Sequence, residues 1–231
     1  MVAKKNGFIV SARQISTTAT ARVGKTASLS LHLTGASCVG NTIIGIGKLM
    51  MGILSLSFFT CASAFYTFGM VIAKCCVLTG IIKENNTKSQ YRYYKFSGLV
   101  LIVSSILYIV YSIRLLLYPV INSYHLYVAL AIATFTFAEL TINIRGVIVY
   151  RHNSTPLVHA IKMINLSSSL ICLVLTQTAI LSIASESIET QPYANGFMGI
   201  LMGSAATILG IVMIGRINRI QKRELGGKVN D

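Results

Sequence analysis

The chain has 231 residues, of which 54% are hydrophobic and 11% charged, and its formal net charge is +14. Because soluble domains carry about a quarter charged residues, the chain has too little polar surface for a water-soluble globule. It contains long apolar runs instead, which predict an all-α polytopic membrane protein. The excess of Lys and Arg does not indicate a nucleic-acid-binding protein, because these residues gather at the ends of apolar runs and no soluble module accompanies them.

The N-terminal segment 1–38 is basic, rich in Ser and Thr, and contains no acidic residue. We expect a disordered tail that lies beside anionic lipid. A leader resembling a transit peptide is one alternative, because such leaders are also rich in Arg and Ser and poor in acids. A translation start placed too far upstream is another, because Met50 and Met51 stand just before a strong apolar run.

The next apolar segment, 42–82, is interrupted by Lys48 and Lys74. A single helix of that length would measure about 60 Å, roughly twice the hydrocarbon core of a bilayer. The segment is therefore either one long tilted helix that projects from the membrane or a tight helical pair that turns near 60–63. The sequence leaves both arrangements open.

Four further spans are expected after this segment. Their approximate bounds are 97–118, 126–150, 163–184 and 196–215. Pro119 ends the first of them, because proline cannot continue a helix interior. Pro156 marks the start of the helix that carries the third, because proline is favoured in a first helical turn.

The connections between these spans alternate in charge. Segments 83–96 and 151–162 and the tail 217–231 are basic, whereas 119–125 and 185–195 contain no Lys or Arg. The positive-inside bias therefore predicts a cell-membrane protein whose basic segments and C-terminus lie in the cytoplasm, where they contact anionic lipid.

The arrangement of 42–82 decides the number of spans. A helical pair gives six spans and puts the basic N-terminus on the cytoplasmic side, whereas one long helix gives five and leaves that N-terminus outside. Six spans agree better with the positive-inside bias. We expect a helical bundle over 39–216, arranged as hairpins.

Glu139 stands near the middle of the 126–150 span, where a carboxylate costs about 2.5–3.5 kcal/mol on insertion scales. Asn143 follows one turn later on the same helix face. The other polar candidates at membrane depth are Lys74, Arg114 and Gln177. A pair between Glu139 and Lys74 or Arg114 would lower the cost of burial.

Three interpretations of Glu139 follow. In the first, Glu139 is a proton- or cation-binding carboxylate in a transport path. In the second, it is one member of a structural ion pair that fixes the register of the helices. The third interpretation is a neutral, protonated carboxyl, because desolvation disfavours the charged form.

Small residues mark the last span, where Gly199 and Gly203 form a G-x-x-x-G pattern and Gly210 follows. Such residues let helix backbones approach closely. Packing within the chain is the ordinary interpretation of this pattern. The alternative is a face for homo-oligomerisation or for another membrane protein.

Catalytic and metal-binding patterns are absent from the sequence. It contains no G-x-S-x-G, Walker loop, dinucleotide fingerprint, H-E-x-x-H or Cys/His cluster, so we expect no catalytic residue, metal or cofactor. The leading interpretation is a small transporter, channel or accessory subunit of a membrane. The alternatives are a structural or regulatory membrane partner and, with less support, a membrane-embedded enzyme.

Overall fold

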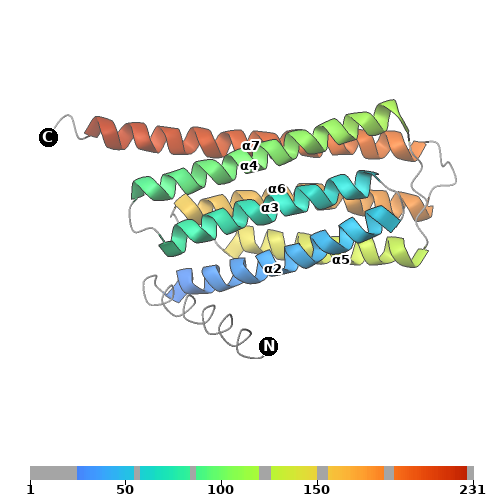
Figure 1. Ribbon diagram of the computed structural model, residues 1–231, viewed down its shortest axis with the longest axis horizontal. Helices are drawn as coiled ribbons and strands as arrows, with labels where there is room; N and C mark the ends of the chain where they lie inside the picture. The colour runs from blue at the N-terminus through green and yellow to red at the C-terminus, as the bar shows by residue number, and fades with distance from the viewer. Residues whose placement is uncertain are drawn as a thin grey trace, which may run out of the picture.

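The computed structural model describes residues 25–54, 58–83, 87–119, 126–149, 156–184 and 190–227, and their regular structure is helical with no strand. The α-helices, coloured along the chain in Figure 1, are α2 (Lys25–Leu54), α3 (Phe58–Lys83), α4 (Thr87–Leu117), α5 (Leu126–Val149), α6 (Pro156–Ala184) and α7 (Gln191–Gly227). The predicted all-α class is confirmed.

The helices run along one common axis, and each reverses the direction of the one before it (Figure 1). α6 is the central helix, because it packs against α3, α4, α5 and α7. In the apolar, membrane-length part of α6, 72% of the residues are buried, compared with 28% in the corresponding parts of α2, α4 and α7. α2 covers α3 on one side of the bundle, and α4 packs between α3 and α7 on the other.

The outer surface of this bundle is suited to lipid. Among the described residues, five helices (α2, α3, α4, α6 and α7) are long and apolar enough to cross a membrane. The 24 residues of α5 exceed the ~20 needed to span a bilayer. α5 also turns large apolar side chains outward, including Leu130 and Phe137. The protein is therefore a helical-bundle membrane protein.

Segment 42–82 forms a pair of helices, as the charge pattern favours. α2 ends at Leu54 and the antiparallel α3 begins at Phe58, a few residues before the predicted turn at 60–63 (Figure 1). Gly52 permits this tight pairing, because a Cβ atom there would lie 2.6 Å from Cys61 Sγ and 2.9 Å from Cys61 N. α2 begins at Lys25, so its first turns belong to the segment that we expected as a tail.

The predicted connection at 83–96 is mostly helix, because α3 continues to Lys83 and α4 begins at Thr87. Tyr91 and Tyr94 are buried, whereas Arg92 between them is exposed. This alternation follows the helical repeat, with aromatic rings on the inner face and charge on the outer face. Basic composition alone suggested a loop, and the spacing of the tyrosines explains the helix.

The last helix is longer than expected at both ends, and the same alternation explains its C-terminal extension. α7 starts at Gln191 and continues to Gly227, beyond the expected 196–215 span. Ile217 is 1% exposed, whereas Arg216 and Arg219 point outward. An apolar stripe thus continues into the basic segment and holds it against the bundle.

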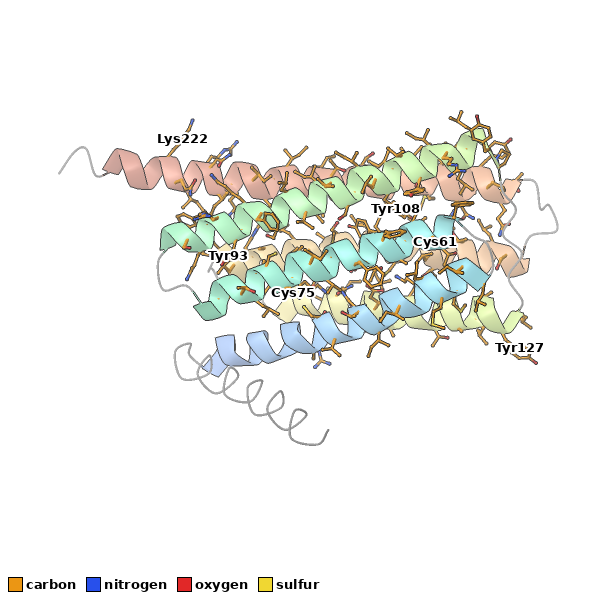
Figure 2. The ribbon with its side chains drawn as sticks, viewed as in Figure 1. Cys61, Cys75, Tyr93, Tyr108, Tyr127 and Lys222 are labelled. Atoms are coloured by element: carbon orange, nitrogen blue, oxygen red, sulfur yellow. The ribbon has the colours of Figure 1, made fainter. Side chains whose placement is uncertain are left out.

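Basic residues gather at one end of the bundle, where α2, α4 and α6 begin and α3, α5 and α7 end (Figure 1). Figure 2 shows Tyr93 and Lys222 at this end and Tyr127 at the opposite end. We call it the basic end; its described basic residues are Arg92, Lys95, Arg145, Lys162, Arg216, Arg219 and Lys222. Arg114 is near the opposite end, with its guanidinium 4.7 Å from the centre of the Phe58 ring.

Candidate functional site

A buried ion pair joins α2 to α5 in the interior of the bundle. Lys48 Nζ lies 3.3 Å from Glu139 Oε2, and their side chains are 8% and 2% exposed. The predicted ion pairs of Glu139 with Lys74 or Arg114 were therefore wrong: Lys74 hydrogen-bonds to Ser37, and Arg114 stacks on Phe58. Lys48 was visible in the sequence only as an interruption of the 42–82 segment.

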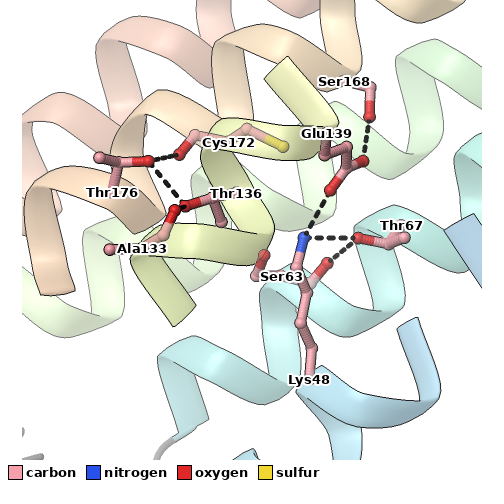
Figure 3. Close-up of polar contacts among 9 residues, drawn as sticks. All are labelled: Lys48, Ser63, Thr67, Ala133, Thr136, Glu139, Ser168, Cys172 and Thr176. Atoms are coloured by element: carbon pink, nitrogen blue, oxygen red, sulfur yellow. Dashed lines mark hydrogen bonds and ion pairs between the residues drawn. The ribbon is translucent and has the colours of Figure 1, made fainter. Parts of the chain in front are cut away.

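Hydrogen bonds from two further helices complete the ion pair (Figure 3). Ser168 Oγ of α6 donates to Glu139 Oε1 at 2.9 Å. Lys48 Nζ donates to Thr67 Oγ1 of α3 at 3.2 Å, and Thr67 Oγ1 donates to the Ser63 carbonyl at 2.9 Å. Four helices thus share the charges, and this pairing lowers the cost of burial at membrane depth.

The ion pair lies within a line of polar residues that we call the polar seam. On each helix these residues recur at spacings of three, four or seven, which places them on one face. The polar seam consists of Ser37, Asn41 and Lys48 of α2; Ser63, Thr67 and Lys74 of α3; Thr136, Glu139 and Asn143 of α5; and Asn165, Ser168, Cys172 and Thr176 of α6. All are buried except the half-buried Ser37.

On the side of the ion pair away from the basic end, the polar seam gives way to apolar surface. Thr136 and Thr176 hydrogen-bond each other at 2.8 Å through their hydroxyl groups. A cavity of about 180 Å³ lies beside them, between α2, α3, α5 and α6. Lys48 and Thr136 contribute to its wall, but most of its lining is apolar, including Met51 and Leu175.

Towards the basic end, the polar seam contains Lys74 and several amide groups. Lys74 is 0% exposed, and its Nζ donates to Ser37 Oγ at 2.8 Å. Both amide atoms of Asn143, Nδ2 of Asn41 and Oδ1 of Asn165 are buried without a hydrogen-bond partner among the described protein groups. Buried polar atoms of this kind usually have a partner, so this part of the seam is suited to hold a polar molecule.

The other predicted residues lie outside this arrangement. Gln177 is half-buried and follows Thr176 directly, so it faces about 100° away from the seam. Gly203 and Gly210 of α7 pack against α4: added Cβ atoms would lie 2.7 Å from Ile109 Cγ1 and 2.6 Å from Ile102 Cγ1, respectively. Gly199 is buried as well. This arrangement favours packing within the chain, the ordinary interpretation of the glycine pattern.

A signal for the polar seam is present in the sequence. Lys48 and Glu139 are charges within apolar helices, Ser63 lies one turn from Thr67, and Asn165 and Cys172 lie one turn from Ser168. Matching these polar faces between helices would have favoured Lys48 as a partner of Glu139. Among the described residues, no group of His, Cys, Asp and Glu has the arrangement of a metal site.

Comparison with known proteins gives no further guide. No protein-family model matches the chain, and no curated protein matches it. The geometry of the polar seam is therefore the guide to function.

Proposed function

We propose that the protein is a small, non-enzymatic membrane transport protein whose polar seam forms part of the transport path. The observation that supports this is the Lys48–Glu139 ion pair, buried between α2 and α5 at 3.3 Å. Ionisable residues within a membrane usually mark an ion path, a proton relay or a substrate site. The unpaired amide atoms of Asn143, one turn from Glu139, add groups to which a passing solute could hydrogen-bond.

Proton flux tests this proposal directly. Purified protein in liposomes that enclose a pH-sensitive dye should acidify the lumen when an inward proton gradient is imposed together with a potassium diffusion potential. Glu139→Gln should reduce the rate to that of protein-free liposomes, because an amide cannot exchange a proton with Lys48 or with water.

Arg145→Gln is the matched control, because Arg145 is on the same helix and exposed. This variant should retain the wild-type flux. Wild-type protein that is folded and incorporated but moves no protons would reject proton-coupled transport through the polar seam.

A structural or regulatory membrane partner is the second candidate function. It is favoured by the completeness of the ion pair, because Lys48 and Ser168 each engage one oxygen of Glu139. In this case Glu139→Gln would lower protein stability, and wild-type protein would show no flux. The two candidate functions thus predict different proton fluxes for the wild-type protein and different effects of Glu139→Gln.

We infer further that the protein lies in the cell membrane with its basic end on the cytoplasmic side, because the exposed Arg and Lys side chains gather at that end. Single cysteines at Tyr193 and Lys222 test this in a chain whose five native cysteines are replaced by Ala or Ser. Both positions are exposed, and they lie at opposite ends of α7. A membrane-impermeant maleimide added to intact cells should label Tyr193→Cys and spare Lys222→Cys; the reverse pattern would invert the orientation.

A further inference from the structure

We propose that the part of the polar seam nearest the basic end binds a small monovalent anion, a halide or short carboxylate, at Lys74, Asn41 and Asn143. The claim that this anion is the transported solute rests on the proposed function, whereas the claim that it binds here does not. Three features of the seam support an anion site: its charge balance, its hydrogen-bond donors and its position in the bundle.

The charge balance leaves one buried lysine without a carboxylate. Helices α2, α3, α5 and α6 contain a single acidic residue, Glu139. Its two oxygens accept hydrogen bonds from Lys48 and Ser168. Lys74 is 0% exposed and hydrogen-bonds to the neutral Ser37. An unpaired ammonium inside a membrane protein is costly, and a bound anion would supply the missing counter-charge.

The donors around Lys74 match an anion. Asn41 is one turn from Ser37, the residue bonded to Lys74, on the same face of α2. Asn143 is one turn beyond Glu139 towards the basic end, and Lys74 is likewise beyond Thr67, the α3 partner of Lys48, towards that end. The Nδ2 groups of both asparagines are buried without a partner among the described residues. An ammonium group and amide N–H groups together form a typical donor set for a carboxylate or halide.

The position of Lys74 favours an anion that enters from the basic end. Lys74 precedes the end of α3 at Lys83 by nine residues, which is about 14 Å along a helix. The exposed Arg92, Arg216 and Arg219 at this end would raise the local concentration of anions. The cavity on the other side of the ion pair has a mostly apolar lining, which is less suited to an anion.

Thermal unfolding of detergent-purified protein tests the site. Sodium acetate or sodium chloride replaces sodium gluconate at constant ionic strength, with gluconate serving as the bulky anion. Wild-type Tm should rise with a saturating dependence on acetate or chloride, by about 5–10 °C at a hundredfold excess over Kd. Lys74→Met should abolish this rise, and Lys222→Met, which removes an exposed charge at the same end, should retain it.

Asn143→Leu provides a second signature that does not depend on how well Lys74→Met folds. It removes buried unpaired polar atoms, so its Tm in gluconate should equal or exceed the wild-type value. Its rise with acetate or chloride should be smaller, because one donor is lost. A wild-type Tm that does not depend on the small anion, or a rise of full size in Lys74→Met, would overturn the proposal. A Tm rise without proton flux would support the anion site and reject proton-coupled transport. Proton flux without a Tm rise would support proton-coupled transport and reject the anion site.

Discussion

Removing either charge of the Lys48–Glu139 pair alone should destabilise the protein by about 3–5 kcal/mol, whereas removing both should leave it close to wild type. Lys48→Met leaves the Glu139 carboxylate buried beside Ser168, and Glu139→Leu leaves the Lys48 ammonium buried without its carboxylate. The double variant Lys48→Met/Glu139→Leu replaces the pair with apolar groups of similar volume. Its stability relative to wild type then depends on packing, because neither member of the pair is left buried alone.

A double-mutant cycle measures this effect. The stabilities of wild type, both single variants and the double variant are compared by thermal unfolding in detergent, with the monodisperse fraction after chromatography as a second measure. Arg145→Gln on the exposed face of α5 is the control and should change little. Single variants that cost no more than this control, or costs that simply add in the double variant, would contradict a close buried pair.

The same cycle separates stability from transport. If the polar seam conducts protons, the double variant should be folded and inactive, because the exchangeable carboxyl is gone while the bundle is intact. If the pair only fixes the register of α2 against α5, the double variant should match wild-type protein in every assay of its partner function. The stable double variant is therefore a better functional probe than either single variant.

The sequence predicted the helices better than the contacts between them. Apolar runs marked the four later helices, the charge pattern favoured a helical pair over 42–82, and Pro119 and Pro156 marked a helix end and start because their effect is local. The ends of α4 and α7 were missed because basic residues there alternate with buried Tyr91, Tyr94 and Ile217. The average composition of such a segment hides this alternation, whereas the helical spacing of its apolar residues reveals a buried face.

The partner of Glu139 could not be predicted from the depth of charged residues within their spans. A depth counted along the chain from the span ends assumes equal, straight spans, and α2 and α5 differ in length at 30 and 24 residues. For Lys48 it also depends on where the 42–82 segment turns, expected at 60–63, whereas α2 ends at Leu54 and α3 begins at Phe58. Lys48 is six residues before Leu54, so a small shift of this turn changes its inferred depth by about a helical turn.

Gly210→Leu is expected to destabilise the α4–α7 contact by about 3 kcal/mol, at the upper end of the usual cost of overpacking. An added Cβ atom would lie 2.6 Å from Ile102 Cγ1, 3.3 Å from the Gly98 carbonyl oxygen and 3.4 Å from Ile102 N. The Ile102 side chain can rotate away, but the α4 backbone can yield only if the two helices separate. The loss should appear as a lower Tm in detergent.

Gly215→Leu on the same helix is the matched control, because nothing lies within 4 Å of an added Cβ atom there. Leucine is a better helix former than glycine by roughly 0.5–1 kcal/mol, so this variant should be neutral or slightly stabilised. Opposite signs for two identical substitutions on one helix would identify close packing as the cause. If Gly210→Leu instead left Tm unchanged and shifted a dimer to monomer in light scattering, the small-residue face of α7 would belong to an interface between copies, and the α4–α7 contact described here would be wrong.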